Sequence, residues 1–147
     1  DEVILRYSEK TGHPARVVEE HALELRRFLV LAATTDKSLP MGGPVDELWH
    51  EFMLHTHLYD QFCQQVAGRF LHHAPGSSGK SRGELMDEWA DFRQRYIDVF
   101  ETEPPAHIWP AADLSDVVLE IGGNGGSIAW QTAVTQGVVV LEFEQLE

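Results

Sequence analysis

Five of the eight histidines in this 147-residue chain fall between residues 50 and 73, and Asp46 precedes the first of them by four residues. On a helix that spacing is one turn, so the side chains of Asp46 and His50 can converge on a single ion. His57 lies seven residues beyond His50, about 10.5 Å along a helix axis, which is too far to share that ion easily. The segment therefore predicts a metal site at Asp46 and His50 that needs another ligand from elsewhere.

The nearest source of that ligand is the adjacent pair His72 and His73, which follows the turn expected at Gly68. Neighbouring side chains usually diverge, so we expect one of the two, with His72 favoured, to join Asp46 and His50. Three protein ligands would leave a position open for water or substrate. Imidazole and carboxylate suit zinc, iron, manganese or copper, so the cofactor is predicted only as a divalent transition metal.

Three further residues of the same region are secondary candidates for ligands: His55, His57 and Cys63. Cys63 falls on the apolar side of the predicted helix, which is more typical of a small buried hydrophobe than of a thiolate ligand. Glu47 and His50 have the Glu-x-x-His spacing of di-iron bundle sites, and Glu20 and Glu24 precede them. This alternative is weaker, because a di-iron site needs that spacing twice and the chain shows it once.

The function inferred from these residues has two versions. The first is a metal-binding domain, with an oxidative or hydrolytic activity as one outcome. The second is a non-catalytic interaction module in which the Trp49-His50 and His-His-x-Pro residues only hold the fold together. A phosphate-binding loop, a GxSxG elbow and an HExxH helix are all missing from the sequence, so catalytic residues stay unassigned.

The elements that must position these residues are helices, because apolar side chains recur at steps of three and four. The pattern predicts helices over residues 1–10, 15–34, 45–66 and 85–100, with a flexible loop over 76–83. We therefore expect a mainly α fold, a compact bundle of about four helices. Residues 1–110 form the predicted helical domain. Residues 111–147 are Gly-rich and then β-prone, either a small hairpin or partly disordered, and not an independent domain.

The net charge of −13, from 24 acidic and 11 basic residues, argues against nucleic-acid binding because it repels a phosphate backbone. Lys and Arg are absent after Arg95, which makes a basic protein a conceivable partner for the acidic C-terminal third. We expect no membrane association, because apolar runs are too short to span a bilayer. A single cysteine and an N-terminus unlike a signal peptide predict a cytoplasmic location. The oligomeric state is left open.

The motifs VDELWH, T-x-x-Y-x-x-x-C, GRFLHHAP, Y-x-x-x-F and IWP occur in this order. In combination they resemble the glycine-rich domain-containing protein-like family of bacteria and plants, over about residues 20 to 110. The matching positions are Asp46, Trp49, His50, Thr56, Tyr59, Cys63, Gly68, His72, His73, Pro75, Tyr96 and Pro110. The resemblance implies the same Asp46, His50 and His72/His73 constellation but little about activity. The sequence IGGNGGS lacks the cysteines of many relatives' tails, and His55 stands where many bacterial relatives have a carboxylate.

Overall fold

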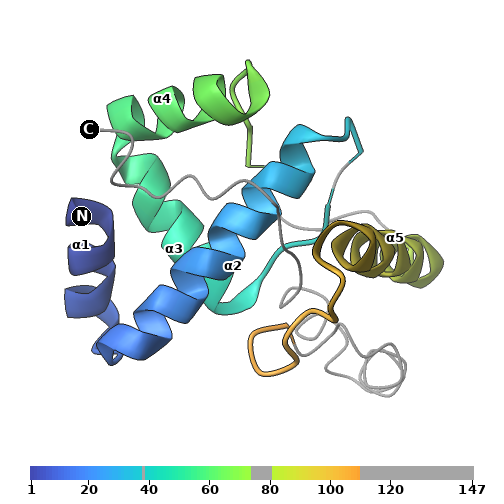
Figure 1. Ribbon diagram of the computed structural model, residues 1–147, viewed down its shortest axis with the longest axis horizontal. Helices are drawn as coiled ribbons and strands as arrows, with labels where there is room; N and C mark the ends of the chain where they lie inside the picture. Colours follow the sequence, from blue (N-terminus) through green and yellow to red (C-terminus); the bar gives the residue numbers. More distant parts are fainter. Residues whose placement is uncertain (38, 74–80, 110–147) are drawn as a thin grey trace.

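The computed structural model describes residues 1–37, 39–73 and 81–109 (Figure 1). The described residues are mainly helical, and the helices are α1 (Glu2–Thr11), α2 (Ala15–Ala33), α3 (Gly43–Leu54), α4 (Thr56–Ala67) and α5 (Arg82–Phe100). The predicted mainly α class is therefore confirmed, with five helices where about four were expected. The β-prone segment 111–147 and most of the predicted loop 76–83 lie outside the described residues.

Helix α1 begins and ends at residues that cap it. The Asp1 carboxylate accepts a hydrogen bond from the Val3 backbone N–H at 2.9 Å. Gly12 ends α1 with a φ of 71°, a left-handed conformation that glycine adopts without strain. Pro14 then precedes the first turn of α2. The short connection sets α1 against α2, and the buried Val3 and Tyr7 join the core.

The predicted helix over residues 45–66 is wrong in one respect, because His55 divides it into α3 and α4. His55 has φ −87° and ψ 66°, outside the helical region. Its N–H and C=O nevertheless bond to Phe52 and Tyr59, so the bend costs little in backbone hydrogen bonding. Figure 1 shows α4 turning away from the direction of α3. Each half can therefore bury its own apolar side against the core.

The start of α5 also differs from the prediction, since residues 81–83 do not belong to a loop. Ser81 accepts a hydrogen bond from the Glu84 N–H at 3.2 Å, and the Glu84 carboxylate accepts one from the Ser81 N–H at 2.6 Å. This reciprocal pair is a capping box, and it satisfies N–H groups at the helix end. The Ser-x-x-Glu spacing of Ser81 and Glu84 is the sequence signal for this helix start.

The centre of the described fold is α2, which in Figure 1 lies between α1, α3 and α4 on one side and α5 on the other. Its buried side chains Leu25, Phe28 and Leu29 meet apolar residues from the other helices. From α5 come Trp89, Phe92 and Tyr96, and Ile108 and Trp109 follow that helix. No helix in the described residues is long and apolar enough to cross a bilayer.

A buried carboxylate ties α5 and the segment after it to α2. Glu24 is 2% exposed and accepts hydrogen bonds from Trp109 Nε1 at 2.8 Å and from the Tyr96 hydroxyl at 3.3 Å. Arg27 bonds the other carboxylate oxygen at 3.1 Å. Glu24 therefore faces α5 and Trp109, and its carboxylate is not among the groups that converge around His50.

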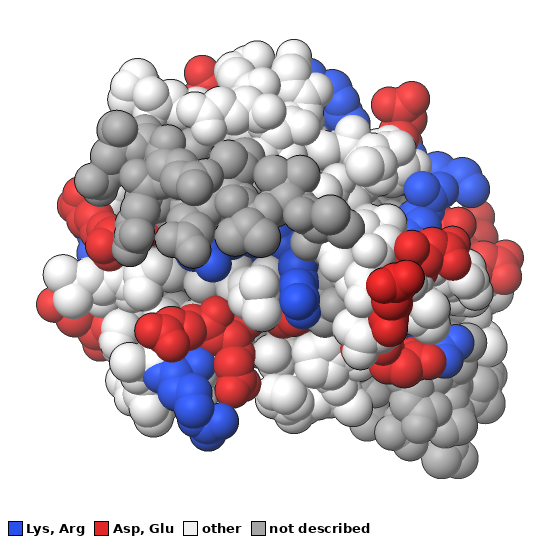
Figure 2. Space-filling view, in the orientation of Figure 1, with Lys and Arg blue, Asp and Glu red and all other residues white. Residues whose placement is uncertain are grey.

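Charged side chains of both signs are interspersed on the face shown in Figure 2. A buried acid of α3 also pairs with basic residues of α1: Glu51 is 3% exposed and lies 3.1 Å from Arg6 and 3.8 Å from Lys10. These pairs hold α1 against α3. A basic protein partner and a cytoplasmic location stay predictions.

Candidate metal centre

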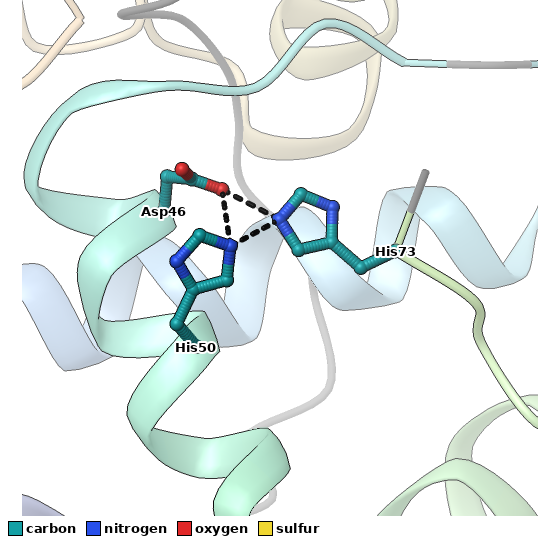
Figure 3. Close-up of side chains that lie close together, drawn as sticks. All are labelled: Asp46, His50 and His73. Carbon is teal, nitrogen blue, oxygen red and sulfur yellow. Dashed lines mark hydrogen bonds and ion pairs between the residues drawn. The ribbon is translucent and has the colours of Figure 1, made fainter. Parts of the chain in front are cut away.

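Three side chains with metal-ligand chemistry converge at the start of α3: Asp46, His50 and His73 (Figure 3). Their ligand atoms all lie within 4.8 Å of one another. His73 Nε2 is 2.7 Å from Asp46 Oδ1 and 2.8 Å from His50 Nε2. The third separation, from His50 Nε2 to Asp46 Oδ1, is 3.6 Å. One histidine of the predicted pair, His73, thus lies beside Asp46 and His50.

Helix α3 presents two of these groups because its other side is fixed in the core. Leu48, Trp49 and Phe52 are at most 4% exposed and set the rotation of the helix. Asp46 and His50, one turn apart, then point away from that side toward His73 (Figure 3). The His50 side chain is 53% exposed, whereas Asp46 is 27% exposed. The cluster is therefore open to solvent on the His50 side.

His73 reaches the cluster from the segment that follows α4, and two rings hold its imidazole. It stacks on the Trp49 indole, with centroids 4.2 Å apart and an interplanar angle of 12°. It also stacks on the His50 ring, with centroids 4.7 Å apart and an interplanar angle of 27°. The His73 side chain is only 15% exposed. Stacking on a buried tryptophan limits the freedom of the imidazole and aims Nε2 at Asp46 and His50.

The backbone just before His73 is held by two residues of α4. The Tyr59 hydroxyl donates a hydrogen bond to the Leu71 carbonyl and accepts one from Trp49 Nε1 at 3.1 Å. The Leu71 N–H donates to Cys63 Sγ at 3.5 Å. Burial raises the pKa of Tyr59 and the pKa of Cys63 above their ordinary values. The Tyr59 hydroxyl therefore keeps its proton, and Cys63 stays a neutral thiol in the core.

One oxygen of the cluster, Asp46 Oδ1, has no hydrogen-bond donor. Asp46 Oδ1 is buried and accepts no hydrogen bond, although two imidazole nitrogens are near it. A buried carboxylate oxygen without a hydrogen bond is costly unless a cation is close to it. Ligand bonds of about 2.0–2.2 Å to a transition metal place adjacent ligand atoms about 3 Å apart in octahedral geometry and about 3.4 Å apart in tetrahedral geometry. The observed separations of 2.7, 2.8 and 3.6 Å fit such a donor set.

The remaining sequence candidates lie apart from this cluster in the described residues: His55, His57, His72 and Cys63. His72, the expected third ligand, is exposed. Its ring packs against Phe70, with ring centroids 4.9 Å apart. His73 takes the place expected of His72, because adjacent side chains of a non-helical segment point in different directions. The contact of Tyr59 with Leu71 could not be inferred from sequence spacing, because the two residues belong to different elements.

Residues 4–96 match one family, described as UCP032817-like. No curated protein and no solved structure matches the chain. The matched range contains Asp46, His50 and His73 together with Tyr59 and Cys63. The resemblance to the glycine-rich domain-containing proteins stays a prediction, because this match does not bear on it. The matched residues make up more than half of the sequence, and the chain therefore belongs to the UCP032817-like family.

Proposed function

We propose that this domain binds one divalent transition metal through Asp46 Oδ1, His50 Nε2 and His73 Nε2. The observation that supports the proposal is the convergence of these three atoms around a carboxylate oxygen that is buried and accepts no hydrogen bond. A cation among them would replace the missing hydrogen bond. It would also take the place of the hydrogen bond that His50 Nε2 and His73 Nε2 share at 2.8 Å.

The donor set narrows the chemistry of the proposed centre. Two histidines and one carboxylate with open positions are the ligands of non-haem iron(II) oxygenases, and zinc hydrolases also use two histidines and a carboxylate. Because the His50 side chain is 53% exposed, water or a substrate could reach a metal held there. We therefore propose a metal-dependent oxidative or hydrolytic activity, in which the metal supplies Lewis acidity or redox capacity and the three side chains hold it.

The competing proposal is an interaction module in which the same residues only lock the fold. The stacking of His73 on Trp49 favours it, because this contact alone would fix the segment after α4. The two proposals differ in what removal of a ligand does. In the metal centre, losing His50 abolishes metal binding and leaves the fold intact, because His50 is 53% exposed. In the interaction module, losing His73 mainly lowers the stability of the fold.

The deciding experiment measures metal content and metal affinity of protein purified without a histidine tag. We expect about one metal per chain after reconstitution, and a rise in Tm on addition of zinc, manganese or, without oxygen, iron(II). His50→Ala and His73→Ala should each abolish metal binding, or weaken it by more than the roughly 10-fold to 100-fold expected for a residue that only supports a ligand. His72→Ala is the matched control, because it removes the adjacent, exposed histidine and should bind metal like the wild type.

Two results would contradict the metal proposal. One is a wild-type protein whose Tm does not respond to any of these ions. The other is a His72→Ala variant that loses affinity as much as His73→Ala does. Circular dichroism of each variant checks that the helices are retained, so that lost binding is not mistaken for unfolding.

A further inference from the structure

Tyr59 connects α3, α4 and the segment that carries His73. Its hydroxyl accepts a hydrogen bond from Trp49 Nε1 on α3 and donates one to the Leu71 carbonyl. Tyr59 is 1% exposed, so water does not compete for either bond. One hydroxyl therefore joins the helix of Asp46 and His50 to the chain that leads to His73.

The Leu71 peptide is held at both of its polar groups. Tyr59 binds its carbonyl, and Cys63, one turn further along α4, accepts from its N–H. The Leu71 side chain is also buried, at 4% exposure. His73 follows two residues later in the same non-helical segment, so a shift of the Leu71 backbone is passed on to its imidazole. Ligand sets tolerate displacements of only about 0.5 Å before their geometry is lost.

Trp49 takes part in this arrangement twice. Its Nε1–H donates to Tyr59, and its ring is the surface on which His73 stacks. Removing the Tyr59 hydroxyl would leave both Trp49 Nε1 and the Leu71 carbonyl without this partner in a buried place. The indole and the Leu71 backbone would then both be free to shift, and each of them bears on the position of His73.

We propose that Tyr59 is a positioning residue of the metal centre: its hydroxyl links Trp49 to the Leu71 backbone and so keeps His73 Nε2 in reach of Asp46 and His50. This inference rests on the proposed function, since it assigns a supporting residue to the same site. It also gives a role to the Tyr-x-x-x-Cys spacing, which places Tyr59 and Cys63 on one side of α4.

The test is Tyr59→Phe, measured by cobalt(II) titration of the untagged protein. Outer residues that orient ligands typically change metal affinity by about 10-fold to 100-fold, and we expect a loss of that size. The visible absorption of bound cobalt should change too, because it reports ligand geometry. Tyr96→Phe is the control: Tyr96 is also fully buried and loses its hydroxyl hydrogen bond to Glu24, whereas Tyr59 loses two, but Tyr96 lies on α5 away from the cluster. It should bind cobalt like the wild type.

A second readout does not depend on metal. Stacking on Trp49 should shift the His73 ring protons upfield in the apoprotein, with the resonance assigned by its loss in His73→Ala. Tyr59→Phe should move it toward the position of an exposed histidine, whereas Tyr96→Phe should not. If Tyr59→Phe does not fold, Cys63→Ala releases the other half of the Leu71 contact and should move the same resonance and weaken cobalt binding.

The outcomes separate the two proposals. Failure of the wild type to bind cobalt overturns the proposed metal centre, and the His73 resonance then decides by itself whether Tyr59 positions that ring. Normal cobalt binding by Tyr59→Phe, with an unchanged spectrum and His73 resonance, overturns the positioning role while the metal centre stands. Equal losses in Tyr59→Phe and Tyr96→Phe would also overturn it, because they would indicate a general loss of stability.

Discussion

Acidification should destabilise this fold through His21, a buried histidine of α2. His21 is 6% exposed, and its Nδ1 lies 3.0 Å from the Tyr7 hydroxyl. That hydroxyl also donates to the Pro44 carbonyl at 3.2 Å, which links the contact to the first turn of α3. Burial lowers the pKa of His21 from 6.5 to about 4. The folded protein therefore holds His21 neutral at pH values where a free histidine is protonated.

The charges near His21 modify this effect without reversing it. After burial, the neighbouring His13, whose ring lies 5.3 Å away, lowers the pKa of His21 most, and His107 lowers it as well. Glu20 acts in the opposite direction. Glu20 also lies 3.1 Å from His107 Nε2, so part of its charge is offset there. Desolvation is the main cause, and the pKa of His21 stays low.

The direction of the pH dependence follows from how many protons the folded and the unfolded protein bind. Between pH 6.5 and about 4 the unfolded chain protonates His21 and the folded protein does not, so stability falls as the pH falls through this range. Above pH 6.5 His21 is neutral in both states, so it causes no loss of stability there. At about 1.4 kcal/mol for each pH unit between the two pKa values, the loss below pH 4 amounts to about 3 kcal/mol.

Urea unfolding between pH 4 and pH 8 measures this loss when the wild type is compared with His21→Gln. The variant cannot titrate at this position, so its free energy of unfolding should depend less on pH, by up to about 3 kcal/mol over the range. His57→Gln is the control, because it makes the same substitution at an exposed position on α4. An NMR titration that places the pKa of His21 near 6.5, or identical pH profiles for wild type and His21→Gln, would refute the reasoning.

Three further changes test the fold by urea unfolding. Glu24→Ala should cost about 3–5 kcal/mol, because it leaves Trp109 Nε1 and the Tyr96 hydroxyl buried without their acceptor; a cost below 1 kcal/mol contradicts this. Gly68→Ala should cost about 1–2 kcal/mol, because its φ of +66° is strained for any residue with a Cβ. The new Cβ would have no atom within 4 Å, so no clash adds to this cost; a neutral effect would show that the turn relaxes. Ser81→Ala should cost about 1 kcal/mol by removing the capping box, and unchanged stability would indicate a frayed first turn.

Local sequence rules predicted most of the helical structure. The periodic apolar residues of α2 and α5 indicated which side is buried, and the expectation that Cys63 lies on an apolar side is confirmed by its burial. The break at His55 was not predicted, because the apolar pattern runs through it and neither Gly nor Pro marks it. A one-residue bend keeps its neighbouring backbone hydrogen bonds, so tertiary packing can impose it at little cost.

For the candidate site, the sequence by itself determined the pair Asp46 and His50, because a spacing of four residues fixes two side chains on one helix turn. It also supplied two adjacent histidines as sources of a third ligand. Only the tertiary structure decided between them. The choice of His73 depends on the Trp49 ring and on the contacts of Tyr59 and Cys63 with the chain before it. Such contacts join residues of different elements, and sequence spacing carries no information about how those elements pack.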